Sequence, residues 1–176
     1  MSTFICGGSK SGKSMWAQRI AASRGQPLYY VATMLPTDAE DAARIRRHRE
    51  ARTGWGFATI ERGRDILDAL DGADPAGTFL VDSVTALLAN EMFDGHGFRP
   101  DASKKVADDL VEFVRLAPNT VLVSDFIFSD AALYDRATEA YRRGLADIGR
   151  RLAGACDNVL EAAAGELIIH KGVLPL

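Results

Sequence analysis

The stretch that decides the fold class reads Gly7-Gly8-Ser9-Lys10-Ser11-Gly12-Lys13-Ser14. It fits the pattern G-x-x-x-x-G-K-[ST], in which glycines let successive backbone N–H groups surround a phosphate at the start of a helix. A short apolar strand pattern precedes the stretch at residues 3–6, and a helical pattern follows it over residues 13–24. Strand, glycine-rich loop and helix in this order predict a phosphate-binding loop, with all eight residues in contact with a nucleotide.

Three residues of this region are expected to have separate chemical roles. Lys13 is predicted to reach the β- and γ-phosphates as a catalytic residue, and the Ser14 hydroxyl to ligate Mg²⁺. A second metal ligand is expected from a carboxylate at the end of a neighbouring apolar strand, and Asp82 ends the strand over residues 78–82. Asp82 could instead cap the helix that follows it. Asp125 ends the next strand in the same way and could also lie beside the nucleotide.

Strand and helix patterns alternate along the whole chain. Strands are predicted at residues 3–6, 28–32, 57–61, 78–82, 119–123, 158–163 and 166–170. Helices are predicted at residues 13–24, 36–52, 64–70, 84–92, 103–116 and 131–154. Several of the strands are apolar throughout, which indicates an α/β fold with a mostly parallel sheet covered by helices on both faces. The length of 176 residues fits a single domain over residues 1–176.

Composition narrows the class of protein. Lys and Arg number 21 against 24 Asp and Glu, and the net charge of −3 disfavours a nucleic-acid-binding protein. The first residues lack the pattern of a secretory leader, and no apolar run approaches the length of a membrane span. The two cysteines, Cys6 and Cys156, lie in apolar surroundings without metal-ligand spacing. These features predict a cytoplasmic protein without disulfides or zinc.

Positive charge is concentrated in one segment. Residues 44–52 hold five arginines and one glutamate, a net charge of +4, so the rest of the chain carries −7. At helical spacing Arg44, His48 and Arg52 share one face, and uncompensated charge there favours the docking of a polyanion. Repulsion from the arginines favours neutral His48, the form that acts as a nucleophile. An exposed surface histidine is the alternative. The arginines of the predicted helix over residues 131–154 alternate with acidic residues and indicate a solvated face.

A resemblance to a known family rests on motifs in a fixed order. After the phosphate loop come Tyr30-Val-Ala-Thr33, Ala43-Arg-Ile-x-x-His48-Arg49, Phe57-x-Thr-x-Glu61 and Leu80-Val-Asp82. This order resembles the bifunctional adenosylcobinamide kinase / adenosylcobinamide-phosphate guanylyltransferase family of cobalamin biosynthesis. The resemblance implies a RecA-like, three-layer P-loop NTPase fold. It also implies phosphorylation of adenosylcobinamide, followed by transfer of GMP from GTP through a histidine to the new phosphate.

The resemblance assigns roles to residues of this chain. His48 matches the histidine that accepts GMP, and Lys13 and Asp82 match the other catalytic positions. Thr33, Arg49 and Glu61 join the phosphate loop in nucleotide binding, with Glu61 as the contact to guanine nucleotide. Mg²⁺, held by Ser14 and Asp82, would accompany GTP or ATP, and the implied partners are a corrinoid and further copies of the chain in a trimer.

The chain departs from the family pattern after its predicted fifth strand. The family has an Asn-Glu-Val-Gly segment and a glycine-rich loop, whereas residues Ser124–Ala132 here lack those glycines and the proline. Two alternatives therefore stay open on the sequence: a P-loop small-molecule kinase without guanylyl transfer, and a nucleotide-binding regulator that has lost catalysis. The Asn-Lys-x-Asp motif with which regulatory GTPases recognise guanine is not present in the sequence. The class of regulatory GTPases is therefore excluded.

Overall fold

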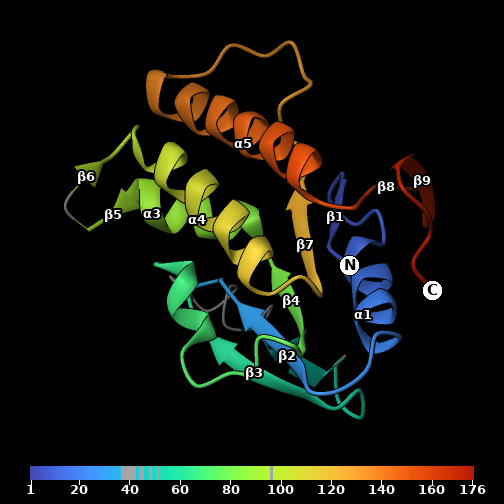
Figure 1. Ribbon diagram of the computed structural model, residues 1–176. Coiled ribbons are helices and arrows are strands. Elements are labelled where there is room, and N and C mark those ends of the chain that lie inside the picture. The colour runs from blue at the N-terminus through green and yellow to red at the C-terminus, as the bar shows by residue number, and fades with distance from the viewer. Residues whose placement is uncertain (37–42, 44–45, 48, 51, 96) are drawn as a thin grey trace.

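The fold is a central sheet with helices on both faces (Figure 1). The computed structural model describes residues 1–36, 43, 46–47, 49–50, 52–95 and 97–176. The strands are β1 (Thr3–Gly7), β2 (Leu28–Ala32), β3 (Phe57–Glu61), β4 (Thr78–Asp82), β5 (Phe93–Asp94), β6 (Gly97–Phe98), β7 (Thr120–Asp125), β8 (Asn158–Ala163) and β9 (Glu166–Lys171). The helices are α1 (Lys13–Ala22), the 3₁₀ helix η1 (Ile66–Leu70), α3 (Val84–Met92), α4 (Ala102–Leu116) and α5 (Arg136–Ala155).

The main sheet has the order β3-β2-β4-β7-β1-β8-β9. Every neighbouring pair is parallel except β8 and β9, which form an antiparallel pair at one edge. The predicted mostly parallel sheet is therefore confirmed. Because parallel strands end at the same edge, the segments that follow β1, β2, β3, β4 and β7 all leave the sheet on one side.

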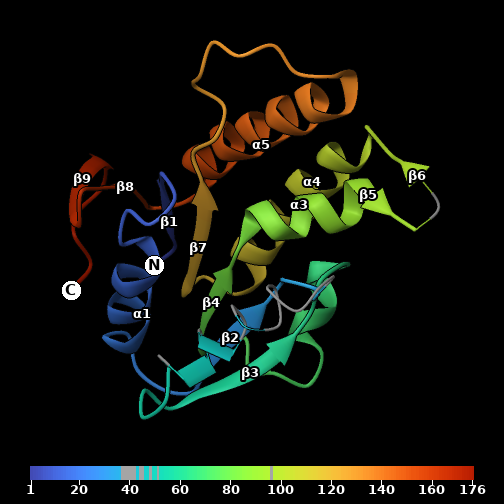
Figure 2. The same ribbon diagram turned by 180° about the vertical axis from the view of Figure 1, so that it is seen from behind.

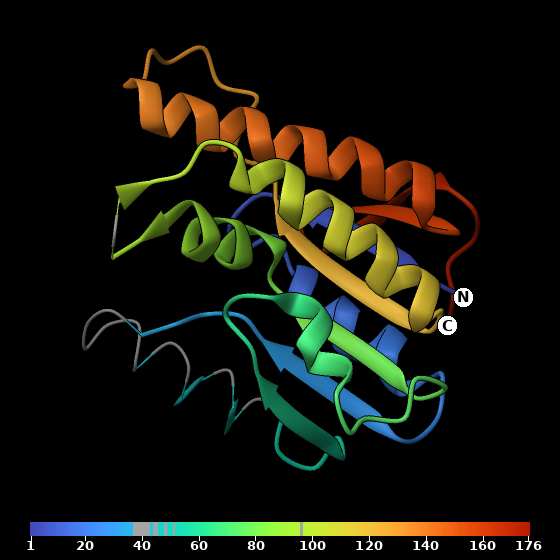
Figure 3. The ribbon, with the colours of Figure 1, turned by 60° about the vertical axis from the view of Figure 1, so that its left-hand side comes forward.

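A hydrophobic core lies between each face of the sheet and the helices that cover it. On one face α1 packs through Ile20 and Ala17 against strand residues such as Ile5 and Val121. On the other face α3, α4, α5 and η1 form the larger core, which contains Leu110 and other large apolar side chains. Figures 2 and 3 show α1 on one side of the sheet and α3, α4 and α5 together on the opposite side. The expected cover on both faces is confirmed.

Side-chain caps fix where two of the helices begin. The Ser83 hydroxyl accepts a hydrogen bond from the Ala86 N–H at the start of α3, so Ser83, and not Asp82, is the cap. At the start of α5 the Asp135 carboxylate accepts from two backbone N–H groups. The prediction that this helix begins at residue 131 is therefore wrong, because residues 131–135 run irregularly up to the cap.

Several smaller elements of the fold differ from the elements predicted from the sequence. The helix predicted over residues 64–70 is the shorter 3₁₀ helix η1, and the small antiparallel pair β5 and β6 was not expected. Of the helix predicted over residues 36–52, residues 43, 46, 47, 49 and 50 are helical, and the others, apart from 36 and 52, lie outside the described residues. Cys156 is buried and Cys6 is half-buried, and both thiols are free.

Candidate active site

The phosphate loop joins β1 to α1 at the edge of the sheet where the parallel strands end. Gly12 has a φ of 96° in the left-handed region, and the Trp16 N–H donates to its carbonyl at 3.2 Å, so the glycine forms the first turn of α1. Gly8, Ser9 and Lys10 are exposed, and Ser11, Gly12 and Ser14 are half-buried. The structure thus brings the predicted octet together as an open loop before a helix N-terminus, the geometry that binds anions.

The turn between β8 and β9 packs against the phosphate loop, a contact that was not predicted from the sequence. The Gly165 N–H donates to the Ser11 carbonyl at 3.1 Å, and the Trp16 indole N–H donates to the Gly165 carbonyl at 2.8 Å. A Cβ atom on Gly7 would lie 2.4 Å from the Ala162 carbonyl oxygen of β8. Glycine is required at position 7 because a neighbouring strand passes so closely.

Lys13 points to the end of β7. Its ammonium group donates to the Gly8 carbonyl at 2.6 Å and lies 2.9 Å from the Asp125 carboxylate. The side chain of Lys13 is only 8% exposed, so the ion pair is largely withdrawn from water. Asp125, which the sequence offered only as a second possibility, is therefore the carboxylate that contacts the phosphate-loop lysine.

Asp125 is itself held by the neighbouring helices. Its backbone N–H donates to the Thr85 hydroxyl at 2.8 Å, and the Tyr141 hydroxyl donates to the Thr85 carbonyl at 2.9 Å. Burial raises the pKa of Tyr141, and the charge of Asp125 raises it further. Tyr141 therefore stays a neutral hydrogen-bond donor at physiological pH, and α3 and α5 together fix the end of β7.

Asp82 lies at the end of β4, next to β7 in the sheet. The Tyr30 hydroxyl donates to its Oδ2 at 3.0 Å. Thr33 is fully buried, its hydroxyl donates to the Ser83 carbonyl at 2.7 Å, and it accepts from the Ser83 N–H at 2.7 Å. The Thr33 hydroxyl thus holds the residue after Asp82.

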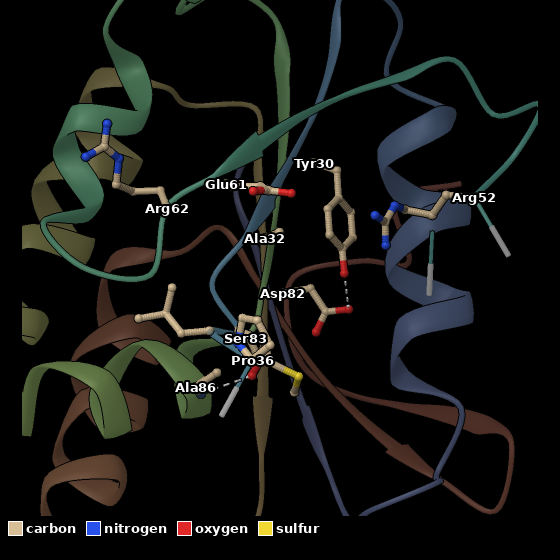
Figure 4. Close-up of a pocket in the computed structure, with 11 residues that line it drawn as sticks. Tyr30, Ala32, Pro36, Arg52, Glu61, Arg62, Asp82, Ser83 and Ala86 are labelled. Atoms are coloured by element: carbon tan, nitrogen blue, oxygen red, sulfur yellow. Dashed lines mark hydrogen bonds between the residues drawn. The ribbon is translucent and has the colours of Figure 1, made fainter. Parts of the chain in front are cut away.

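A cavity of about 370 Å³ opens beside Asp82, between the ends of β2, β3 and β4 (Figure 4). Its apolar walls include Ala32, Leu35 and Ala86. The charged side chains that line it are Arg52, Glu61, Arg62 and Asp82. An apolar pocket with a few convergent polar groups has the properties and the size of a small-molecule site.

Two of the predicted nucleotide-binding residues meet at the rim of this region. The Arg49 guanidinium lies 3.0 Å from the Glu61 carboxylate, and both side chains are mostly exposed. A surface pair of this kind contributes little to the stability of the fold. Breaking it therefore costs little free energy, and Glu61 and Arg49 are each able to bind a ligand in place of the other. The predicted nucleophile, His48, and Arg44 lie outside the described residues.

Two arginines that were expected on exposed surfaces, one solvated and one facing a polyanion, are buried. Arg142, expected on the solvated face of the last helix, is only 8% exposed and pairs with Asp130 and Glu139 at 2.9 Å each. Arg52 is also buried, at 7% exposed, with its guanidinium carbon 3.4 Å from the centroid of the Tyr30 ring. The helical pattern in the sequence predicts the spacing of these two arginines along their helices. It does not predict their burial, because burial depends on which loops and strands pack against them.

No helix in the described part of the chain combines the length and the apolar character that crossing a membrane requires.

The sheet order, the two helical layers and the phosphate loop at the strand ends define the P-loop NTPase fold of the RecA-like type. The fold matches a solved structure from Pyrococcus horikoshii OT3 with a TM-score of 0.56 and 13% identity, covering 98% of this chain and 86% of that one. It also matches the RadB recombinase, with a TM-score of 0.52 and 18% identity over 99% of this chain and 82% of that one.

The model of the family described as cobinamide kinase / cobinamide phosphate guanyltransferase matches residues 3–169, and the chain belongs to this family. It is 28% identical to the bifunctional adenosylcobalamin biosynthesis protein CobU of Salmonella typhimurium, covering 94% of this chain and 97% of the relative. It is 29% identical to the protein CobP of the same description from Pseudomonas aeruginosa, covering 98% of both. The resemblance inferred from the sequence motifs is confirmed.

Proposed function

We propose that this chain is a bifunctional enzyme that phosphorylates adenosylcobinamide and then transfers GMP from GTP to the new phosphate, giving adenosyl-GDP-cobinamide. The observation that carries the proposal is the family match over residues 3–169. The relatives matched over nearly their whole length are named bifunctional adenosylcobalamin biosynthesis proteins. The phosphate loop and the cavity beside Asp82 support a site that holds a nucleotide and an acceptor.

In the kinase reaction the phosphate loop holds the triphosphate of ATP or GTP. The acceptor hydroxyl oxygen bonds to the γ-phosphorus, the bond from that phosphorus to the bridging oxygen breaks, and the nucleoside diphosphate and the hydroxyl proton are released. Backbone N–H groups of the loop and the Lys13 ammonium stabilise the negative charge on the transferred group. Lys13 reaches the phosphates after it leaves Asp125, its partner at 2.9 Å.

In the guanylyl transfer a nitrogen of His48 bonds to the α-phosphorus of GTP, and pyrophosphate leaves. A phosphate oxygen of adenosylcobinamide phosphate then bonds to the same phosphorus, the phosphorus–nitrogen bond breaks, and His48 is restored. The Glu61 carboxylate is suited to accept hydrogen bonds from the N–H groups of guanine, and Arg49 beside it to bind a phosphate. Thr33 acts indirectly, because its hydroxyl is bonded to the backbone of Ser83.

Mg²⁺ fits the residues proposed to hold it. The Ser14 hydroxyl and the Asp82 carboxylate are oxygen ligands, the type that Mg²⁺ prefers. In the described part of the chain no three His, Cys, Asp or Glu side chains form a ready-made metal cluster. This agrees with an ion held largely by nucleotide phosphates and water. When bound, Mg²⁺ would neutralise negative charge on the triphosphate. The Ser14 hydroxyl and the Asp82 carboxylate would hold the ion in place.

The proposal extends to assembly and compartment. The partners are a nucleoside triphosphate and a corrinoid. The family resemblance favours a trimer, and the sequence features described above favour the cytoplasm. The corrinoid is expected in a cleft of the P-loop domain or between subunits.

A product assay tests the proposal. The purified chain is incubated with Mg²⁺, adenosylcobinamide and either ATP or GTP, and the corrinoid products are identified by mass spectrometry. Adenosylcobinamide phosphate followed by adenosyl-GDP-cobinamide with GTP supports both activities. Accumulation of the phosphate alone would identify a simple kinase, and binding of nucleotide without either product would identify a regulator.

A further inference from the structure

Asp125 lies at the end of β7, directly opposite the first residue of the phosphate loop. The register of the parallel strands pairs it with Gly7. Along β7 it shares a face with Val121 and Val123, which pack in the core on the α1 side of the sheet. Its carboxylate therefore points to the start of α1, where it lies 2.9 Å from the Lys13 ammonium.

Backbone hydrogen bonds on both sides of Asp125 fix its position. Its own N–H donates to the Thr85 hydroxyl at 2.8 Å, and the N–H of the next residue, Phe126, donates to the Gly7 carbonyl at 2.9 Å. A side chain that is supported in this way keeps a defined position at a site. The side chain is 26% exposed, so the carboxylate is accessible to a molecule that enters from solvent.

The ion pair with Lys13 determines when this carboxylate becomes available. In the kinase reaction Lys13 leaves Asp125 to bind the phosphates of the nucleotide. Asp125 then loses its cationic partner but stays beside the phosphate loop, because its backbone bonds do not involve the lysine. A carboxylate without a cation is an acceptor for the proton of a hydroxyl group. Nucleotide binding thus releases a base next to the group that is transferred.

The other carboxylates at this edge of the sheet have different partners. Asp82 accepts a hydrogen bond from the Tyr30 hydroxyl at 3.0 Å and is the proposed ligand of Mg²⁺. Glu161 of β8 lies 2.8 Å from the imidazole of His170. Asp125 differs from both, because its ionic partner is the lysine that a nucleotide displaces.

We propose that Asp125 is the general base of the kinase reaction. As the acceptor hydroxyl oxygen bonds to the γ-phosphorus, its proton moves to a carboxylate oxygen of Asp125. The electron pair of the broken phosphorus–oxygen bond stays on the nucleoside diphosphate. After the products leave, Asp125 gives the proton to water and pairs with Lys13 again. An aspartate has this role in protein kinases, and such a base contributes about 10²–10⁴-fold to the rate.

The inference rests on the proposed function for the identity of the acceptor, so two acceptors are tested. The full chain is incubated with Mg²⁺ and γ-labelled ATP or GTP, whichever the wild type uses faster. Transfer of the label is measured to adenosylcobinamide and, without the corrinoid, to water, with phosphate and pyrophosphate separated by chromatography. Calorimetry gives the Kd of the β,γ-imido analogue of the same nucleotide.

The variants separate the charge of Asp125 from its size. Asp125→Asn removes the charge at constant size, Asp125→Glu keeps a carboxylate, and Asp125→Ser is a smaller uncharged side chain for use if Asp125→Asn does not fold. Asp109→Asn, which removes a carboxylate paired with Lys105 on α4, is the control.

The expected result is a loss of turnover without a loss of binding. Asp125→Asn lowers kcat for adenosylcobinamide by at least about 100-fold and slows hydrolysis by at least about tenfold, with a Kd no higher than that of the wild type. Asp125→Glu is at least about tenfold faster than Asp125→Asn, because it still accepts a proton. Asp109→Asn keeps both rates and the Kd within about twofold of the wild-type values.

Two results would overturn the inference. One is a fall in kcat of less than about tenfold in the uncharged variant that folds. The other is a Kd at least about tenfold higher in that variant, which would make Asp125 a ligand of the nucleotide's metal. A failure of the proposed function is distinguishable, because wild type that hydrolyses the nucleotide but leaves adenosylcobinamide unphosphorylated contradicts that function, while hydrolysis still tests Asp125. Wild type that transfers phosphate to neither acceptor overturns both.

Discussion

The ammonium group of Lys13 lies 2.9 Å from the carboxylate of Asp125, across the gap between the phosphate loop and the end of β7. The same ammonium donates to the Gly8 carbonyl at 2.6 Å. The lysine that should meet the phosphates is thus already bonded to two groups of the protein. A nucleotide phosphate has to replace Asp125 as the partner of Lys13, and it approaches against the charge of that carboxylate.

Replacing Asp125 with Asn is therefore expected to strengthen nucleotide binding. The variant removes the competing charge and keeps the size of the side chain, and the Kd of GTP should fall by about tenfold, which corresponds to roughly 1.4 kcal/mol. Isothermal titration calorimetry of wild type and Asp125→Asn measures the change. Asp109→Asn, which removes a carboxylate 3.0 Å from Lys105, is the control and should bind GTP as the wild type does. Weaker binding by Asp125→Asn would instead make Asp125 a ligand for the nucleotide's metal.

Gly7→Ala is expected to destabilise the fold. The new methyl group would lie 2.4 Å from the backbone oxygen of Ala162, and a paired strand cannot move away without breaking its ladder. A cost of about 1–3 kcal/mol in the free energy of unfolding follows from overpacking of this kind. Urea unfolding provides the measurement, and Gly8→Ala is the matched control because its methyl group would meet no atom within 4 Å. Equal loss of stability in both variants would refute the steric explanation.

Asn90→Ala is expected to loosen two loops beside the cavity. The Asn90 amide donates to the Thr33 carbonyl at 2.7 Å and to the Gly63 carbonyl at 2.9 Å, so one side chain joins the loops that follow β2 and β3. Without it the KM for substrate should rise several-fold, and stability should fall by about 1–3 kcal/mol because buried acceptors lose their donor. Steady-state kinetics and thermal unfolding measure the two effects. Asn119→Ala, which removes an exposed bond to Ala76 between loops at the other end of the sheet, should leave KM unchanged.

Acid should weaken the fold partly through Asp157. Hydrogen bonds from the Ser2 backbone N–H and hydroxyl hold the pKa of Asp157 below its ordinary value of 3.8. Since the folded pKa is the lower one, the contribution is complete above the ordinary pKa and is lost as the pH falls through the folded pKa. Unfolding free energies measured from pH 6 down to pH 2 should therefore decline more steeply in wild type than in Asp157→Asn. Parallel curves for the two proteins would contradict this assignment.

The sequence predicted the fold well because its strongest signals are local. The octet before α1, the apolar strands such as residues 78–82 and the periodicity of residues 103–116 depend on neighbours in the chain. The predicted start of α5 is wrong because residues 131–134, which continue the helical pattern, precede the capping residue Asp135, and the helix begins only after this cap.

The site was predicted less completely than the fold, because contacts within the site join segments that are far apart in the sequence. Nothing in the sequence indicated that Lys13 pairs with Asp125, although both residues were noted, because the pairing depends on β7 lying next to β1. The burial of Arg52 on Tyr30 likewise depends on tertiary packing. His48 remains a prediction from the sequence, supported by the family match.

The covalent step through His48 is the central claim, and labelled GTP tests it most directly. The protein is incubated with Mg²⁺ and GTP labelled at the α- or the γ-phosphate, and the acid-labile label retained on denatured protein is counted. We predict retention of the α-label alone, its loss in His48→Asn, and wild-type retention in His170→Asn, which alters a surface histidine paired with Glu161. Undiminished α-label on His48→Asn, or no retained α-label on wild-type protein that still forms adenosyl-GDP-cobinamide, would contradict a histidine-bound intermediate at position 48.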